Sequence, residues 1–485
     1  MNAARRVVLC ALAALAGCTV GPDFRAPDPP AVERYVPGSP PAAAGMPRLV
    51  VTRDIPAEWW SVFGSPEIDA LVRRALAQSP TLDEARARLT QAQELRTARA
   101  GAAEYPQVDA KFGAVRQRID PATFGFPQAP NPGPFNVFSL GADVSYNFDI
   151  FGGTRRELEA LAAEVDYQVF ELEAARLTLA TNVVTTAIRQ AALSAQIDTA
   201  SAVLAAQRRQ LAIVEERYAA GGVAWLDVQN QRALAAQTEA ALPPLGAQRA
   251  QAGHLLAVLM GDPPASAELP VLHLRELRLP SELPLRVPSE LIRQRPDIRA
   301  SEALLHQASA NIGVATADLY PKLIISGGFS ASQLNIAQVL GNGINIWNIG
   351  ANLLQPLFRG GELQARKRAA MAAFDQAAAA YRLSVLQGLQ NVADVLRSLE
   401  ADAQSLAART EQAARADDAF RIVLGRYNAG GVSQFAVLDA DRQRMQAEID
   451  RLQAEANRYA DAAALYAAMG GGWVVPAGAS PPPAQ

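Results

Sequence analysis

The sequence predicts an α+β protein made of two similar halves, each with two strands and two long helices. Three observations support this prediction. Residues 154–218 contain no Pro or Gly, and one uninterrupted helix over them would be about 100 Å long. Residues 137–150 alternate apolar and polar side chains, which is typical of a strand with two unlike faces. Motifs of the first half recur in the same order about 210 residues later.

Three motifs define this internal repeat. Tyr105-Pro106 recurs as Tyr320-Pro321, and Phe151-Gly152-Gly153 has a counterpart in residues 358–361. The third motif, Arg-Tyr-x-Ala-Gly-Gly-Val, occupies residues 217–223 and again 426–432. Because three motifs keep one order at nearly one spacing, we expect two structural repeats. They cover residues 61–260 and 291–469, with a linker over 261–290.

Each repeat is expected to follow the same plan, in which a shorter helix, two strands and a long helix precede a Gly-Gly turn and a second long helix. In the first repeat the strands fall at about 108–120 and 135–151, and the long helices at 154–218 and 224–260. In the second repeat the strands fall at about 321–333 and 344–357, and the long helices at 360–427 and 433–469. Leu158, Val165, Leu172 and Leu179 lie seven residues apart, which is the spacing of a coiled-coil seam.

The N-terminus has the pattern of an export signal. Arg5 and Arg6 precede an apolar stretch that is too short to span a bilayer and ends at Cys18. Small residues before a cysteine predict a signal peptide over 1–17 and lipidation of Cys18. The alternative is an ordinary signal peptide cleaved near Ala16. Thr19 follows the cysteine where an Asp would favour inner-membrane retention, so we expect an outer-membrane address.

Pro-rich segments flank the two repeats. Residues 18–60 are expected to form a lipid-anchored, extended arm, and residues 470–485 a C-terminal tail.

The number of predicted strands decides whether one chain could form a membrane barrel by itself. The predicted strand at 137–150 suits a membrane strand, but four strands cannot enclose a pore, and an open sheet edge is not tolerated in lipid. If these strands lie in a membrane, several chains must share one barrel, and three chains would supply twelve strands. The alternative is a soluble four-stranded sheet packed on helices.

The composition excludes several functions. With 48 acidic and 45 basic side chains, the chain lacks the basic footprint of a nucleic-acid-binding protein. Three His and two Cys residues leave little for a metal site. His254, His273 and His306 are widely separated in the sequence and are expected to be structural or solvated. No G-x-S-x-G, P-loop or H-E-x-x-H motif is present, so we expect no enzyme activity and no cofactor.

With these features in place, the sequence resembles the TolC-like outer-membrane factors of bacterial efflux and type I secretion, and specifically their NodT-type lipoprotein branch. The matching segments are residues 59–71, 149–153, 217–228, 255–264, 288–302, 320–322, 356–361 and 426–432. The stretch 288–302, which contains Arg295-Pro296-Asp297-Ile298, is the most specific of them.

The resemblance implies a homotrimer in which four strands per protomer form a twelve-stranded β-barrel in the outer membrane, above a long α-helical barrel in the periplasm. Such a protein is the exit duct of a tripartite efflux system. Its partners would be a periplasmic membrane-fusion adaptor, an inner-membrane resistance–nodulation–division (RND) pump and outer-membrane lipid, and its cargo drugs or other small molecules. The alternatives are the duct of a type I protein secretion system and, less favoured, a soluble coiled-coil periplasmic lipoprotein scaffold.

Three groups of residues are candidates for function. The two Gly-Gly turns are expected to be the periplasmic tips, which in the family resemble the adaptor-docking sites; the alternative is a purely structural role. They comprise Arg217, Tyr218, Gly221, Gly222, Val223, Arg426, Tyr427, Gly430, Gly431 and Val432. Asp417, Asp418 and Arg421 are periplasmic gate candidates by the same resemblance, the alternative being a solvated i, i+4 pair. The pore-lining candidates are Asp109, Lys111, Asp143, Asp149 and Asn352.

Overall fold

The computed structural model describes residues 19–38, 43–51, 55–131, 133–339, 341 and 344–473. Cys18, the predicted lipidation site, and most of the predicted C-terminal tail lie outside these residues. The chain divides into two compact units, each built from three segments. The first unit comprises residues 1–27, 89–168 and 301–381, and the second comprises 28–88, 169–300 and 382–485.

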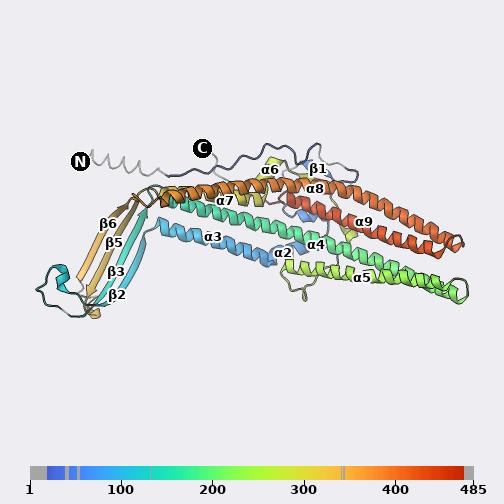
Figure 1. Ribbon diagram of the computed structural model, residues 1–485, viewed down its shortest axis with the longest axis horizontal. Helices are drawn as coiled ribbons and strands as arrows, with labels where there is room; N and C mark the ends of the chain where they lie inside the picture. The colour runs from blue at the N-terminus through green and yellow to red at the C-terminus, as the bar shows by residue number, and fades with distance from the viewer. Residues whose placement is uncertain are drawn as a thin grey trace. The chain divides into compact units, whose positions relative to one another are not determined.

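The first unit contains the predicted four-stranded sheet. Its strands are β2 (Gln107–Gln117), β3 (Phe135–Phe148), β5 (Lys322–Gln333) and β6 (Ile344–Leu354). They pair in the order β2-β3-β5-β6, with every neighbour antiparallel. Figure 1 shows them side by side. Each repeat thus contributes one hairpin, and the two hairpins join at β3 and β5.

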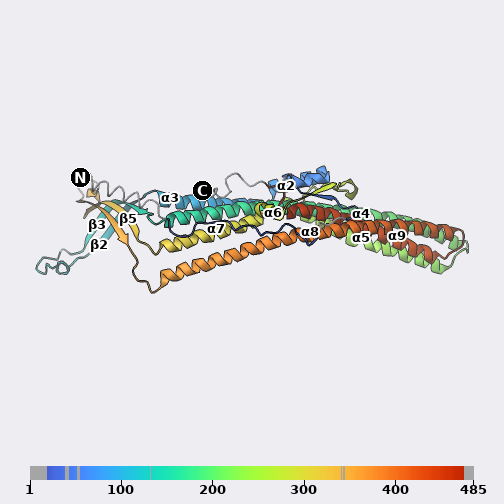
Figure 2. The same ribbon diagram turned by 90° about the horizontal axis from the view of Figure 1, so that it is seen from above.

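Four long helices fall at the positions predicted for them. They are α4 (Gly153–Ala219), α5 (Trp225–Met260), α8 (Glu362–Asn428) and α9 (Gln434–Ala468). The shorter helices α3 (Pro80–Glu104) and α7 (Pro296–Ala317) precede the two hairpins. α5 continues through Pro243 and Pro244. Figures 1 and 2 show α8 and α9 side by side, and Arg409 on α8 lies 3.0 Å from Asp450 on α9.

Within the second unit, a small core forms where the predicted arm meets the first repeat. The 3-10 helix η1 (Trp59–Phe63) buries Trp59 and Phe63, and α2 (Pro66–Gln78) buries Ile68 and Leu71. Trp59 stacks on Tyr466 of α9 with ring centroids 5.5 Å apart. Aromatic burial of this kind secures the arm to the helices.

A second, two-stranded sheet was not expected. β1 (Arg48–Val51) from the predicted arm pairs in parallel with β4 (Glu282–Leu285) from the predicted linker. An ion pair between Arg48 and Glu282 closes one end of the pairing. The four-residue strands are too short to produce a recognisable alternation, so only the tertiary structure identifies them.

The remaining short elements lie in the loops and the linker: η2 (Pro121–Phe124), η3 (Leu274–Glu276), α6 (Pro288–Gln294) and η4 (Ile336–Gln338). Among the described helices, none is both long and apolar enough to cross a bilayer.

Candidate functional site

The register of the four-stranded sheet gives it one polar and one apolar face. Asp109 on β2 lies opposite Asp143 on β3, which in turn lies opposite Gly328 on β5. Since side chains alternate along a strand, Lys111 and Asn352 share this face. Lys111 forms an ion pair with Asp143. Four of the five pore-lining candidates therefore lie on one face of one sheet.

Asp149, the fifth candidate, does not lie on a strand. β3 ends at Phe148, two residues earlier than the alternation suggests. The carboxylate of Asp149 instead accepts a hydrogen bond of 3.0 Å from the backbone N–H of Arg155, in the first turn of α4. A carboxylate at this position satisfies a free N–H and favours the helix dipole.

The opposite face of the sheet is apolar and open in the single chain. It carries Phe112 on β2, Phe329 on β5, and Trp347, Ile349 and Leu353 on β6, all of them exposed. Ile349 keeps 77% of its surface accessible and Trp347 keeps 74%. So large an apolar patch marks a surface that a lipid or protein partner covers.

The two Gly-Gly turns have the same geometry. Gly221 adopts φ +77°, and its N–H donates to Tyr218 O at 2.9 Å while Gly222 N–H donates to Arg217 O at 2.8 Å. Gly430 adopts the same φ, with matching bonds from Gly430 to Tyr427 and from Gly431 to Arg426. This is the Schellman motif, in which a left-handed residue ends the helix and satisfies its last carbonyls.

Exposed apolar and aromatic side chains surround these turns. Leu226 and its repeat counterpart Phe435 expose 66% and 70% of their surface. Trp225 is half exposed, and it lies between the ring of Tyr218 and the guanidinium of Arg232. Arg217 of the first turn lies 5.6 Å from the ring centre of Tyr427 in the second. The turns therefore present a cationic and apolar surface built from both repeats.

Behind the turns, a network of buried side-chain hydrogen bonds joins the α4–α5 hairpin to the α8–α9 hairpin. Tyr427 donates to Gln434 at 3.2 Å, Gln434 to Gln231 at 3.2 Å, and Gln231 to Gln207 O at 3.2 Å. Gln207 then donates to Asp441 at 2.9 Å. These residues, Tyr427 apart, are buried. No sequence pattern predicts this network, because its members come from four different helices.

The described residues contain no cluster of His, Cys, Asp and Glu side chains suited to a metal. His306 is not a solvated side chain, however. Its Nε2 lies 2.9 Å from Glu159 Oε1, and its ring stacks on Phe24.

Comparison with known proteins identifies the family. The family model for outer membrane efflux proteins matches residues 71–262 and 287–471. The chain belongs to the outer membrane efflux protein family. The two matched segments correspond to the two repeats, and the unmatched residues between them fall in the linker.

Relatives of this outer membrane efflux protein align along nearly their whole length. The pyoverdine export outer membrane protein OpmQ of Pseudomonas aeruginosa is 32% identical over 86% of this chain and 87% of its own. Nodulation protein T of Rhizobium leguminosarum bv. viciae is 26% identical over 96% and 93%. Among solved structures, the outer-membrane channel OprN superposes with a TM-score of 0.82 at 29% identity, covering 94% of this chain and 99% of that one.

The resemblance to TolC-like outer-membrane factors is thereby confirmed, and so is the fold class. This efflux protein is an outer-membrane channel that extends into the periplasm. The soluble periplasmic scaffold is excluded as an alternative. The matched family is one of outer-membrane efflux channels.

The most specific stretch of this efflux protein is explained by its contacts. Arg295, nearly buried, donates from Nη1 to Ala468 O at 3.1 Å and pairs with Asp297 at 2.7 Å. Pro296 begins α7, and Ile298, two residues later, is fully buried. The motif therefore starts one helix and caps the C-terminus of another, α9.

The gate candidates of the efflux protein form ion pairs within one helix. Arg421 lies 2.9 Å from both Asp417 and Asp418 on the exposed side of α8. Arg444 of α9 approaches Asp417 at 3.8 Å and pairs with Asp441 at 2.8 Å. The structure thus contains the i, i+4 pair named as the alternative, and the gate role stays a prediction.

Proposed function

We propose that three copies of this chain form one water-filled exit duct of a tripartite efflux system. The observation that carries the proposal is the one-sided sheet. Within the described residues, β2 and β6 each leave an edge unpaired, and the apolar face is uncovered. In lipid every backbone N–H and C=O needs a partner, so β6 of one protomer must pair with β2 of the next. A twelve-stranded closed barrel satisfies both edges.

The polar face then lines the duct. Asp109, Lys111, Asp143 and Asn352 would contact water there and set the conductance and ion preference. The loops after β2 and β5, which contain η2 and η4, would lie at the outer mouth. Cargo selection would belong to the pump, because this face carries few side chains able to recognise one molecule. We therefore propose drugs or other small molecules as the cargo class.

The Gly-Gly turns would be the docking tips. They present exposed apolar side chains next to two arginines, a surface suited to a periplasmic membrane-fusion adaptor. That adaptor would connect the duct to an inner-membrane RND pump. The docking residues would be Arg217, Tyr218, Gly221, Gly222, Val223, Arg426, Tyr427, Gly430, Gly431 and Val432, with Leu226 and Phe435 beside them.

Lipidation at Cys18 would hold each protomer at the outer membrane. Several acyl chains on one cysteine anchor a protein stably where a single chain does not. Replacing Cys18 with Ser should abolish acylation, and palmitate incorporated into that variant would refute the lipid anchor.

Export and assembly test the function together. Deleting the gene should raise the intracellular level of a fluorescent dye that efflux pumps remove, and the wild-type gene should restore the low level. Native mass spectrometry of detergent-purified protein should show a trimer. Phe435→Asp should abolish export yet leave the trimer intact, whereas Val271→Asp, at an exposed position of the linker, should leave both export and the trimer intact. A monomer, or full export by Phe435→Asp, would contradict the corresponding part of the proposal.

Conductance tests the gate. Replacing Asp417 and Asp418 with Ala removes both partners of Arg421 and the α9 contact from Arg444. If these carboxylates close the duct, single-channel conductance in planar bilayers should rise. The matched control is Asp439→Ala, which removes an exposed pair to Arg442 on α9. Equal conductance in all three proteins would exclude the gate role.

A further inference from the structure

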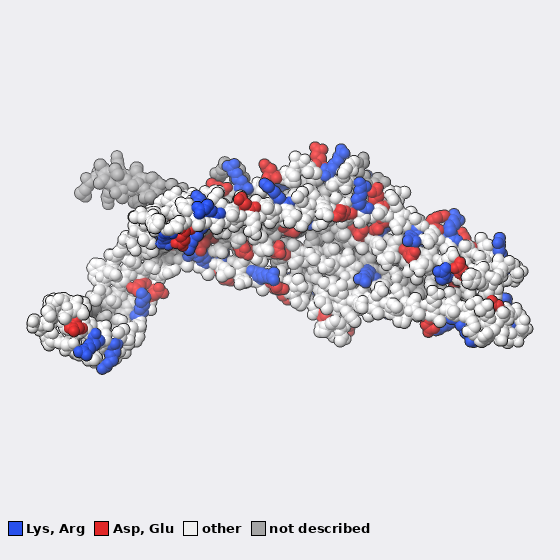
Figure 3. All heavy atoms as spheres, in the orientation of Figure 1, with Lys and Arg blue, Asp and Glu red and all other residues white. Residues whose placement is uncertain are grey.

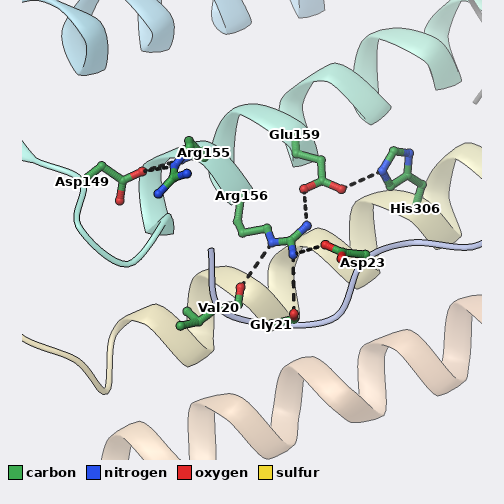
Figure 4. Close-up of polar contacts among 8 residues, drawn as sticks. All are labelled: Val20, Gly21, Asp23, Asp149, Arg155, Arg156, Glu159 and His306. Carbon is green, nitrogen blue, oxygen red and sulfur yellow. Dashed lines mark hydrogen bonds and ion pairs between the residues drawn. The ribbon is translucent and has the colours of Figure 1, made fainter. Parts of the chain in front are cut away.

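The first described residues, Thr19–Phe24, lie against the start of α4 and the side of α7. Val20 N–H donates to Phe151 O at 3.1 Å. Arg156 returns three contacts: Nε donates to Val20 O at 3.2 Å, and Nη2 lies 3.5 Å from Gly21 O and 2.6 Å from Asp23 Oδ1. Figure 4 shows the guanidinium between this segment and Glu159.

Arg156 is placed to receive this segment. Its side chain is only 5% exposed, whereas that of Asp23 is 91% exposed. Burial acts to lower the pKa of Arg156, but hydrogen bonds to Asp23 and Glu159 outweigh it and raise the pKa. Glu159 stays ionised because hydrogen bonds from His306 and Arg156 lower its pKa. Without the segment, the buried cation would lose three of its four partners, which is costly.

Glycines give the segment its close fit. A Cβ on Gly21 would lie 2.4 Å from Gly313 Cα, and a Cβ on Gly152 would lie 2.7 Å from Thr19 Cγ2. A Cβ on Gly313, inside α7, would lie 2.6 Å from Arg156 Cγ. All three contacts are shorter than real Cβ atoms show, so the segment and Arg156 pack this closely because these residues have no side chain. Phe24 completes the contact by stacking on His306 at 4.4 Å.

We propose that Arg156, Glu159, His306, Gly152 and Gly313 form a seat for the chain's own N-terminal segment, and that this seat fixes where the lipid anchor enters the membrane. Phe151, which Val20 contacts, lies three residues after the end of β3. Cys18 immediately precedes the seated segment. The seat therefore tethers the acylated residue beside the base of the strands, so that its acyl chains enter the leaflet those strands cross. This inference rests on the proposed lipidation of Cys18.

Limited proteolysis of the detergent-purified protein tests the seat. Trypsin can cut after Arg25, an exposed residue that follows the seated segment. Arg156→Gln should accelerate this cut by about tenfold or more, because the segment is released. Arg155→Gln is the matched control, since Arg155 lies next to Arg156 in the chain but contacts Asp149 and not the segment. Equal rates in the wild type and Arg156→Gln, or an equal gain in Arg155→Gln, would overturn the proposal.

Gly313→Ala separates release of the segment from loss of folding. Alanine favours a helix over glycine by about 1 kcal/mol, so α7 itself gains stability, while the new Cβ displaces Arg156. The cut after Arg25 should again accelerate, with no cut after Arg382 inside α8. A cut within α8 of Arg156→Gln would show that this variant is misfolded, and Gly313→Ala then decides the outcome. If the cut after Arg25 is no faster in Gly313→Ala than in the wild type, the seat is refuted.

A thiol probe separates the seat from the lipid. In the mature chain Cys18 is the one cysteine, so Thr19→Cys adds a single free thiol when Cys18 is acylated. A membrane-impermeant maleimide should label it slowly, and about tenfold faster when Arg156→Gln is added. Labelling of the protein without Thr19→Cys would show that lipidation fails, whereas equal labelling with and without Arg156→Gln would show that the seat fails.

Discussion

Asp402 on α8 and Asp461 on α9 are two carboxyl groups that share a partly buried position. Burial, the charge of Asp461 and a hydrogen bond with it raise the pKa of Asp402 to about 7, although Arg458 acts in the opposite direction. Burial also raises the pKa of Asp461, against hydrogen bonds from Asp402 and Ser398. Two close carboxylates cannot both ionise easily, so the pair holds a proton that separate groups would release.

The pair predicts a loss of stability as pH rises. The unfolded chain releases this proton near the ordinary value of 3.8, whereas the folded chain keeps it to about pH 7. The free energy of unfolding therefore falls between these values and stays low above them. Asp402→Asn should raise the unfolding midpoint in detergent at pH 8 by about 2–4 °C and by a smaller amount at pH 5. Asp439→Asn, at a partly exposed carboxylate, is the control; an equal gain at both pH values would contradict the shared proton.

The two glycines of one turn should respond differently to substitution. Gly221 has φ +77°, so Gly221→Ala should cost about 1 kcal/mol or more in left-handed strain. Gly222 has no positive φ, and its Cβ would meet Arg217 O at an ordinary 3.4 Å. Hydrogen–deuterium exchange of the turn amides should therefore accelerate in Gly221→Ala and hardly change in Gly222→Ala. Equal acceleration in both variants would show that the positive φ of Gly221 is not what makes glycine necessary in this turn.

The long helices derive their packing from small side chains and a few polar contacts. α4 buries Ala187, Ile188 and Ala191, and α8 buries Val392, Leu396 and Leu399. Small residues allow backbones to approach closely, and so the hairpins can pack without large side chains. Near the turns the buried Gln network joins these helices across the two repeats.

Removing one hydrogen bond of this buried network should destabilise the helical hairpins α4–α5 and α8–α9. Gln231→Leu keeps the volume but leaves Gln434 Nε2 without its acceptor, and the expected cost is about 1–3 kcal/mol. Gln434→Leu should cost a similar amount for the same reason. The double substitution should cost less than the sum, since no half-satisfied partner remains between them. Denaturant titration in detergent measures all three, and strict additivity would show that the two side chains do not interact.

At the scale of the whole molecule, the sheet requires neighbours that a single chain does not supply. Its apolar face is exposed and two of its edges are unpaired within the described residues. A soluble sheet would cover such a face with its own helices.

Adjacent positions on β6 distinguish the two faces. Ile349→Arg places a charge on the proposed lipid face and should cost about 2–4 kcal/mol near the bilayer midplane. We expect loss of the heat-modifiable trimer from the outer-membrane fraction on gels run without boiling. Asn348→Arg, one residue earlier on the polar face, should still assemble. Assembly of both variants, or of neither, would contradict the assignment of the faces.

Much of this architecture could be predicted because its signals are local. The Pro- and Gly-free stretch at 154–218 predicts α4, the internal repeat predicts its counterpart α8, and the alternation at 137–150 predicts β3 and its faces. Prediction was weaker at ends and in short elements: Asp149 continues the alternation of β3 but binds the N-terminus of α4. The pairing of β1 with β4 and the seat of Arg156 could not be predicted, since each joins segments more than a hundred residues apart.

The sequence by itself determined the two repeats, the lengths of the helices, the polar and apolar faces of the strands and the Gly-Gly turns. These follow from periodicity and backbone preference, which act between near neighbours in the chain. Only the tertiary structure decided which distant side chains meet: the Gln network behind the turns, the caps on α9 from Arg295, and the buried cation that holds the N-terminal segment. Such contacts depend on how helices and strands pack, and no local pattern encodes their partners.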